Sequence, residues 1–359
     1  MANANIPLAQ QLQEGRFLVI GRVGMDLTPT PENTPTQHAD SMMVSMGGSS
    51  ANIAAGLVKL GCKASLVTCV SDDAIGWYCE NQLDHYGVDR QYVRRVTGEA
   101  RTSLAIYETR IENHQSVIYR NQAADFQLNE TDIATIDFQQ FSAVIATGTV
   151  FAAEPSRSAV LAAFKRAAAL DLPIVFDIDY RPYSWTCAEE AIEVLSLAAS
   201  QADLIVGNED EFSFMTGGIE EGLQSAQSMA QASAKIAIYK RGEKGAFTYW
   251  NRDHHSALIN KTADVTSAST LSATNQNLPA GVNCLETGVF PAKAIKPTGA
   301  GDSFLSGFLT SLAQGYSLKD AILRGSACAA IVVSKPGCAI AMPSQSELVQ
   351  FIKENDPCI

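Results

Sequence analysis

Short apolar segments alternate with amphipathic, helix-like segments along most of the chain. Runs such as FLVI at 17–20, ASLVTCV at 64–70 and PIVF at 173–176 are of β type, whereas 50–60 and 156–170 have the spacing of helices. Further strands are predicted at 143–146, 203–206 and 235–239, and further helices at 73–86, 188–199, 300–312, 317–334 and 344–353. Because the strands are almost uniformly apolar and are separated by helices, we expect an α/β, doubly wound, mainly parallel sheet flanked by helices.

Two regions depart from this alternation. Within about 36–47 and 101–122, polar and apolar residues alternate and no helix intervenes, so these strands should form a separate small sheet. A small β-sheet near the start of an α/β domain is suited to act as a lid over the active site. Residues 251–291 are rich in Ser, Thr, Asn and Ala, and we interpret them as an extended surface excursion without direct chemistry.

Composition narrows the classes of partner. The 359 residues include 26 Lys and Arg against 38 Asp and Glu, a formal net charge of −12, which disfavours non-specific binding to nucleic acid or to anionic membranes. No apolar run approaches the ~20 residues that span a bilayer, and the first 13 residues lack the features of a secretory signal, so we expect a cytoplasmic protein. The eight cysteines are scattered, which favours reduced thiols over a disulfide framework or a zinc site.

The strongest chemical signal is the segment KPTGAGDSFLSGFL at 296–309. Gly299, Ala300 and Gly301 are small residues directly before a predicted helix, so several backbone N–H groups can converge there with the positive end of the helix dipole. Asp302 follows in the first helical turn. It either stabilises the helix N-terminus or takes a proton from a hydroxyl group while the adjacent amides hold a phosphoryl group.

A second glycine-rich segment, GGSSAN at 47–52, precedes another predicted helix. It is either a turn with a helix cap or a place where the backbone at Gly48 and the side chain of Asn52 approach a polyol. The sequence has no G-x-x-x-x-G-K-[ST] motif, and GRVGMD at 21–26 does not match the G-x-G-x-x-G pattern of dinucleotide enzymes. An ordinary P-loop is therefore excluded, and a dinucleotide oxidoreductase is disfavoured.

Together, GGSSAN near the start and PTGAGD near the end resemble the two signature regions of the PfkB/ribokinase family of carbohydrate kinases. Their order and separation fit, and further matches are GMD at 24–26, NEDE at 208–211 and KRGEKG at 240–245. The resemblance covers about residues 15–353 and implies one ribokinase-like kinase domain that uses ATP and Mg²⁺. It also implies that Asp302 is the catalytic base and that Gly299, Ala300 and Gly301 form the anion hole.

The same resemblance assigns the binding residues. Those for sugar hydroxyl groups are Asp26, Gly48 and Asn52. Those for the nucleotide are Asn208, Lys240, Gly242, Gly245 and Ser326, and Glu211 is expected to act on Mg²⁺ or its waters. Taken alone, the acidic cluster at 208–211 is also typical of a helix N-terminus, and 240–245 could be a plain hairpin turn.

Some stretches are closer to one branch of the family. Segments 147–160, 177–185 and 325–343 resemble its kinases of keto-deoxy sugar acids, which implies transfer of the ATP γ-phosphate to a terminal hydroxyl group. An acidic substrate needs a cation, and the planar fork of arginine matches a carboxylate. Arg181 is the first candidate, with a structural ion pair as the alternative role. Arg120 in the lid is the second, with a solvated surface position as the alternative.

Other functions stay open at this level. Kinases of 2-keto-3-deoxygluconate or of neutral sugars such as fructose are the main alternatives, and a non-catalytic sugar or nucleotide sensor is a further one. Lys296 occupies a position where many relatives carry an Asp that helps to bind a monovalent cation, so we expect activity without K⁺. An exposed strand edge of the lid can also pair with a second subunit, which predicts a homodimer.

Overall fold

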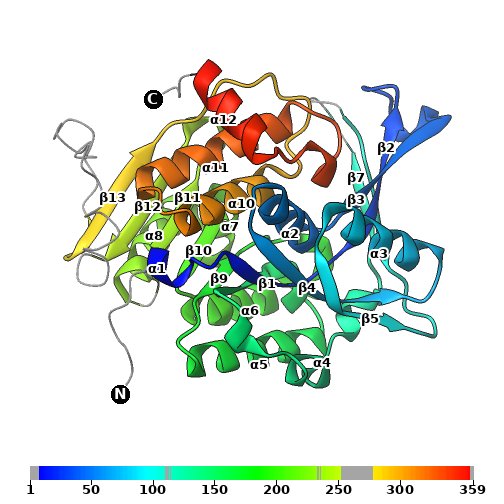
Figure 1. The fold of residues 1–359 in the computed structure, drawn as a ribbon, viewed down its shortest axis with the longest axis horizontal. Helices are drawn as coiled ribbons and strands as arrows, with labels where there is room; N and C mark the ends of the chain where they lie inside the picture. Colours follow the sequence, from blue (N-terminus) through cyan, green and yellow to red (C-terminus); the bar gives the residue numbers. More distant parts are fainter. Residues whose placement is uncertain are drawn as a thin grey trace.

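The computed structural model describes residues 8–109, 113, 115–232, 234, 236–251 and 278–355. Their strands form a nine-stranded sheet and a separate four-stranded sheet (Figure 1). In spatial order the large sheet contains β13 (Val282–Thr287), β12 (Ala246–Asn251), β11 (Ile236–Lys240), β10 (Leu204–Asn208), β9 (Ile174–Asp177), β8 (Ala143–Thr147), β1 (Arg16–Ile20), β4 (Lys63–Ser71) and β5 (Asp89–Val96). The predicted fold class is confirmed, since only β12 runs antiparallel to its neighbours β11 and β13.

The middle of the large sheet explains why its strands lack polar positions. In parallel register, Val19 of β1 lies beside Leu66 of β4 and Ile145 of β8, and all three side chains are fully buried. A central strand of such a sheet is covered by helices on both faces, so side chains of both orientations must be apolar. This is the pattern that the run FLVI carries.

Helices cover both faces of the large sheet. The apolar core of one face includes residues of α4 (Glu130–Ala134), α5 (Ser156–Ala169), α6 (Ala188–Ser200), α7 (Glu209–Thr216) and α8 (Ile219–Ala232). The core of the other face includes residues of α1 (Leu8–Gln11), α2 (Ser49–Lys59), α3 (Ala74–Tyr86), α10 (Ala300–Ala313) and α11 (Leu318–Val333). The last helix, α12 (Gln345–Glu354), packs on α11. The large sheet is therefore the middle of three layers, with one layer of helices packed on each of its faces.

The small sheet stands at one side of the molecule (Figure 1). In spatial order it contains β3 (Ser41–Gly47), β2 (Gly24–Thr30), β6 (Ser103–Tyr107) and β7 (Ser116–Tyr119). Three of these strands lie within the segments from which the sequence predicts a small sheet, but β2 was not predicted. Asp26, expected at the end of the first strand, therefore lies inside β2.

The structure also contains strands that the sequence pattern did not predict in the large sheet. Both β5 and β13 are edge strands. Most side chains of β5 are exposed or half-buried, which weakens its apolar signal, whereas β13 exposes only Glu286. Strand β13 lies within 251–291, the range interpreted as a surface excursion, and it pairs with β12. Residues 252–277 of that range lie outside the described residues.

The cysteines and the longest helices bear on two of the sequence predictions. Each of the seven cysteines in the described ranges is a free thiol, and most are buried. Burial raises the pKa of the Cys328 and Cys338 thiols to about 12, so both are expected to be protonated and unreactive. Within the same ranges, the longest apolar helices fall short of what is needed to cross a bilayer.

Candidate active site

The carboxyl ends of neighbouring parallel strands bring several polar residues to one edge of the large sheet. Asp177 ends β9, Asn208 ends β10 and Lys240 ends β11. Asn208 and Lys240 lie directly opposite each other in the parallel register. Ligands of doubly wound sheets bind in the crevice outside this edge, so these side chains mark a binding site.

Asp302 lies in the first turn of α10 and is buried at this site, with 9% of its surface exposed. Its Oδ2 accepts a hydrogen bond of 2.8 Å from Nδ2 of Asn52, a residue 250 positions earlier in the chain. Burial raises the pKa of Asp302 to about 6, the nearby charge of Asp179 adds to the rise, and the hydrogen bond from Asn52 opposes it. A carboxylate with a pKa near neutrality can accept a proton and release it again.

The loop before α10 has the geometry that an anion hole needs. Gly299, at the N-cap, has a φ of 84°, in the left-handed region that favours glycine. A Cβ atom on Gly301 would lie 3.1 Å from Nζ of Lys240, so the ammonium group is next to this loop. The N–H of Ala300 donates to the carbonyl oxygen of Pro297, and those of Gly301 and Asp302 have no backbone acceptor among the described residues. These N–H groups and the lysine charge favour an anion here.

Lys296 precedes the same loop and is buried, with 2% of its surface exposed. Its Nζ donates a hydrogen bond of 2.6 Å to the carbonyl oxygen of Thr298. Burial lowers the pKa of Lys296, while Cys338 and Asp302 oppose this change. The ammonium group thus provides a fixed positive charge that also orients the backbone of the anion-hole loop.

On the side of the small sheet, Asp26 is buried opposite the glycine-rich segment. A Cβ atom on Gly47 would lie about 2.0 Å from the Asp26 carboxyl group, and one on Gly48 would lie 2.4 Å from the carbonyl oxygen of Arg22. Gly48 has a φ of 99° and caps α2, which carries Asn52 in its first turns. The two glycines therefore permit the close approach of β2, β3 and α2.

Several buried oxygen atoms of this region have no hydrogen-bond partner among the described residues. They include Oδ1 of Asp26, Oδ1 of Asn52 and the hydroxyl groups of Thr28 and Ser45. Burial raises the pKa of Asp26 to about 6, with the charge of Arg22 opposing and that of Asp302 adding to the rise. Unpaired buried acceptors are costly, so a ligand with hydroxyl donors matches this part of the site.

Both arginines expected to bind a substrate carboxylate are paired with carboxylates of the protein. Nη2 of Arg181 lies 2.8 Å from Asp179, and its Nη1 lies 3.6 Å from Glu211. Arg120 donates a short hydrogen bond to Asp125 and is buried, with 6% exposed, so it is not a solvated surface residue. A direct role of either arginine in substrate binding stays a prediction.

The acidic residues after β9 and β10 form a crowded group. Asn208 and Glu211 make a reciprocal capping box at the start of α7, with two hydrogen bonds of 2.8 Å. Glu211 is buried, and burial raises its pKa while Lys240 and Arg181 oppose the change. Burial likewise raises the pKa of Asp177 well above its usual range. The helix-capping interpretation of this cluster is therefore confirmed, and Glu211 also lies 3.6 Å from Arg181.

The remaining predicted nucleotide residues lie further along the chain. Gly242 and Gly245 form the turn between β11 and β12, with φ values of 57° and 82°. A Cβ atom on Gly245 would lie 1.9 Å from the carbonyl oxygen of Thr287, so the turn packs against the end of β13. Ser326 is buried within α11. Contact of these three residues with a nucleotide stays a prediction.

Three residues of the site were not predicted as functional. Asp177 and Asp179 flank Ile178 directly after the run PIVF, and Arg22 follows FLVI after one glycine. Polar residues at the carboxyl end of a buried strand are the signal that could have identified them. The contacts of these three residues depend on the tertiary fold, which cannot be predicted from the local pattern of apolar and polar residues.

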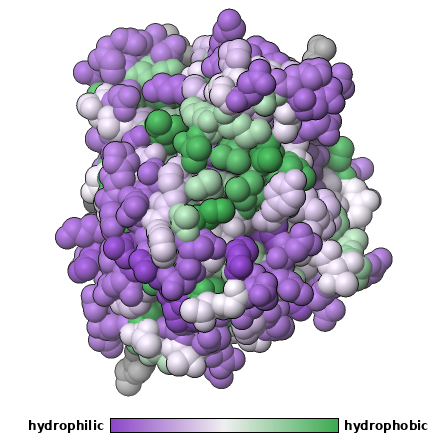
Figure 2. Space-filling model, turned by 90° about the vertical axis from the view of Figure 1, so that its right-hand side faces the viewer, coloured by the Kyte–Doolittle hydropathy of each residue, from purple (hydrophilic) through white to green (hydrophobic). Residues whose placement is uncertain are grey.

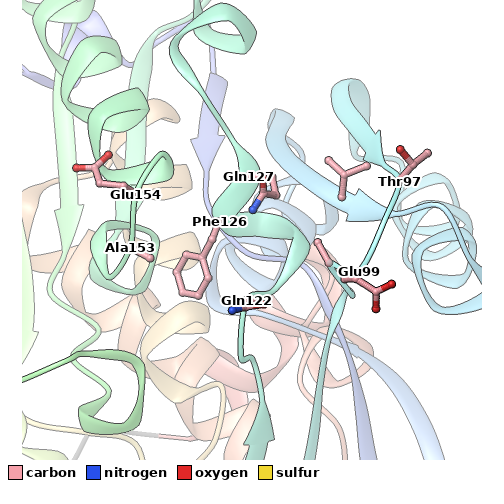
Figure 3. A pocket seen from close by; sticks show the side chains of 9 residues that line it. Thr97, Glu99, Gln122, Phe126, Gln127, Ala153 and Glu154 are labelled. Carbon is pink, nitrogen blue, oxygen red and sulfur yellow. The ribbon is translucent and has the colours of Figure 1, made fainter.

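A separate hollow of about 470 Å³ contains none of the predicted site residues. In Figure 3 Phe126 lies between Ala153 and Glu154 on one side and Thr97 and Glu99 on the other. The guanidinium of Arg120 lies 4.2 Å from the centre of the Phe126 ring. The hollow therefore lies beside Phe126, which packs against Arg120, and its lining includes the polar residues Glu99, Gln122 and Glu154.

The fold is of the α/β class and the site places a buried carboxylate beside a glycine-rich helix N-terminus; comparison with known proteins gives the family. The profile described as "pfkB family carbohydrate kinase" matches residues 15–273 and 280–345. The chain belongs to the pfkB family of carbohydrate kinases and is a sugar kinase.

Individual relatives cover nearly the whole chain. A 5-dehydro-2-deoxygluconokinase of Photobacterium profundum is 32% identical over 352 residues, which is 96% of this chain and 98% of that protein. One of Geobacillus kaustophilus is 31% identical over 343 residues, 94% of each chain. A structure of fructokinase with bound ATP from Xylella fastidiosa has a TM-score of 0.77 at 20% identity, covering 95% of this chain and 99% of that one. An aminoimidazole riboside kinase from Salmonella enterica gives 0.72 at 20% identity, covering 94% and 99%. The two structures share the fold of this chain.

Proposed function

We propose that the protein transfers the γ-phosphate of ATP to the terminal hydroxyl group of a keto-deoxy sugar acid. The proposed substrate is 5-dehydro-2-deoxy-D-gluconate, which would place the enzyme in inositol catabolism. The observation that carries the proposal is the buried Asp302 carboxylate, hydrogen-bonded to Asn52, at the start of α10 and beside the Lys240 ammonium group. The names of relatives about 32% identical over nearly the full length support the choice of substrate.

The geometry supports an in-line transfer with one base. Asp302 accepts the proton of the terminal hydroxyl group while the oxygen of that hydroxyl group bonds to the γ-phosphorus. The bond from the γ-phosphorus to the oxygen that bridges it to the β-phosphate breaks, and ADP leaves. The N–H groups after Gly299 and the ammonium of Lys240 stabilise negative charge on the moving phosphoryl group. The unpaired oxygens of Asp26 and Asn52 accept hydrogen bonds from other sugar hydroxyl groups.

The small sheet would complete the site as a lid. Its inner face carries the buried polar residues Asp26, Thr28 and Ser45, two of which lie opposite each other in the β2–β3 register. Closing this face over a bound sugar would exclude water from the phosphoryl group and so limit wasteful hydrolysis of ATP.

The residues present fit Mg²⁺ as the usual partner of ATP. Glu211, with Asn208, would hold the ion on the nucleotide side through its waters, next to the other buried carboxylate Asp177. The described residues contain no cluster of three or more metal-binding side chains. This is compatible with Mg²⁺, which is usually coordinated by substrate phosphates, water and only one or two protein carboxylates. When bound, Mg²⁺ neutralises charge on the phosphate oxygens.

An assay of ATP turnover against four acceptors tests this function. The acceptors are 5-dehydro-2-deoxygluconate, 2-keto-3-deoxygluconate, fructose and ribose, with Asp302→Asn as the inactive control. We expect the highest kcat/KM with 5-dehydro-2-deoxygluconate. Preference for 2-keto-3-deoxygluconate or fructose would reassign the substrate, and ATP or sugar binding without turnover would indicate a sensor.

We further propose that the small sheet joins two subunits. In the register of β3, β2, β6 and β7, apolar side chains lie opposite one another on the face away from Asp26. They are Met25, Leu27, Val44, Leu104, Ile106, Val117 and Tyr119. Figure 2 shows a continuous apolar patch on the side of the molecule that carries this sheet. Monomeric proteins rarely expose such a patch, and a second copy of the same face would cover it.

A further inference from the structure

Arg22 lies where the large sheet passes into the small sheet, between β1 and β2. Its Nη1 donates a hydrogen bond of 2.8 Å to Oγ of Ser103, the first residue of β6. Gly24 lies opposite Ser103 in the parallel register, and a Cβ atom on Gly24 would lie 2.9 Å from Nη1 of Arg22. The glycine therefore leaves the space that the guanidinium group occupies.

The backbone of Arg22 is held by the glycine-rich segment. Its carbonyl oxygen accepts a hydrogen bond of 3.3 Å from the N–H group of Ala51 and lies against Gly48. The same segment leads into α2 and Asn52, which bonds to Asp302. The position of Arg22 is thus coupled through a few residues to the position of the catalytic base.

The charge of Arg22 has no ion-pair partner within the ranges that the structure describes. No carboxylate there lies within 4.0 Å of its guanidinium group, and its hydrogen bond to Ser103 leaves most of its five N–H donors unused. Arg120 and Arg181 are both occupied by protein carboxylates. Arg22 is also only partly buried, so a ligand can reach it.

The guanidinium group of Arg22 lies on the same face of the small sheet as Asp26. Gly24 and Asp26 are two residues apart in β2 and so point to the same face of the sheet. A Cβ atom on Gly24 would lie 2.9 Å from Nη1 of Arg22, which places the guanidinium group on that face.

We infer that Arg22 binds the carboxylate of the substrate, with its guanidinium fork on the two acid oxygens. This inference rests on the proposed function and names the residue that selects acids over neutral sugars. A chain with an acid at one end and a primary hydroxyl group at the other would lie along Asp26, with the acid at Arg22 and the hydroxyl group at Asp302. Arginine suits the role because its planar donors match a carboxylate in pairs.

The test compares Arg22→Gln and Arg22→Lys with the wild type on two ligands: 5-dehydro-2-deoxygluconate and its C1 amide. Arg101→Gln is the control, because Arg101 is exposed, close to β6, and bonded to the carbonyl oxygen of Gly98. For Arg22→Gln we expect KM and calorimetric Kd for the acid to rise about 10- to 100-fold, the range for a lost charged hydrogen bond. The values for the amide and kcat with the acid should change less than about threefold.

The outcomes separate this inference from the function on which it rests. A wild type that phosphorylates only neutral sugars would overturn both. A wild-type acid kinase whose Arg22→Gln variant weakens acid and amide equally, or weakens neither, would overturn the role of Arg22 alone. If Arg22→Gln does not fold, Arg22→Lys decides, because loss of the fork should raise the acid KM several-fold more than the amide KM.

Discussion

Replacing Asp302 by Asn should remove catalysis and stabilise the fold at the same time. Burial raises the pKa of this carboxyl group from 3.8 to about 6. At 1.36 kcal/mol per pKa unit, keeping the group ionised in the folded protein costs about 3 kcal/mol at pH 8. Asparagine has the same shape, and its oxygen can accept the hydrogen bond from Asn52 without that cost.

The sign of the effect depends on pH. The cost is fully present above the folded-state pKa of about 6 and disappears below 3.8, where the folded and unfolded proteins are both protonated. Asp302→Asn should therefore raise the free energy of unfolding by up to about 3 kcal/mol at pH 8 and by only about 0.5 kcal/mol at pH 4. Loss of a general base lowers turnover about 100- to 10,000-fold, or by about 3–5 kcal/mol in the barrier.

Urea denaturation at both pH values and coupled ATP turnover measure the two effects, and calorimetry shows whether the sugar still binds. Asp320→Asn is the matched control, since Asp320 occupies the first turn of α11 but is exposed. It should change neither turnover nor stability at pH 8 beyond about 0.5 kcal/mol. An Asp302→Asn enzyme with wild-type turnover, or one whose gain in stability over the wild type is no larger at pH 8 than at pH 4, would refute the reasoning.

Three further predictions concern pH, cations and assembly. Wild-type kcat/KM should fall as pH drops through about 6, because Asp302 becomes protonated, and a flat profile from pH 5 to 8 would contradict this. Because the Lys296 ammonium already donates to the anion-hole loop, K⁺ at constant ionic strength should change the rate less than about twofold; strong activation by K⁺ would show otherwise. Light scattering should find a dimer that Val44→Glu converts to monomer while Leu197→Glu, on the surface of α6, does not; a monomeric wild type would exclude the proposed interface.

Much of the fold could be predicted because its strands and helices follow local rules. Uniformly apolar runs such as FLVI indicate strands covered on both faces, and the glycines before α2 and α10 mark helices that begin at tight turns. The carboxyl-edge rule then brings Asn208 and Lys240 together without any knowledge of their contacts. The hydrogen bond between Asn52 and Asp302 agrees with the placement of both residues in one site.

The rest depended on tertiary contacts. Strand β5 lies at an edge of the sheet with most of its side chains exposed or half-buried, so its sequence lacks the apolar signal, and β13 has the polar residues Asn283 and Glu286 between buried ones. Strand β2 has the sequence GMDLTPT, in which the buried Asp26 carboxyl group lies against Gly47 of β3. The pairing of Arg181 with Asp179, and the lack of such a partner near Arg22 in the described residues, are set by how loops meet across the crevice.

Analysis of the reaction product is the most direct test of the central claim. Purified protein is incubated with ATP, Mg²⁺ and 5-dehydro-2-deoxygluconate, and the products are identified by phosphorus and carbon NMR. We predict one ADP for each phosphomonoester formed, with the phosphate on the terminal oxygen of the acid. ADP released without a phosphorylated acid, or phosphate attached to any other position, would contradict the account.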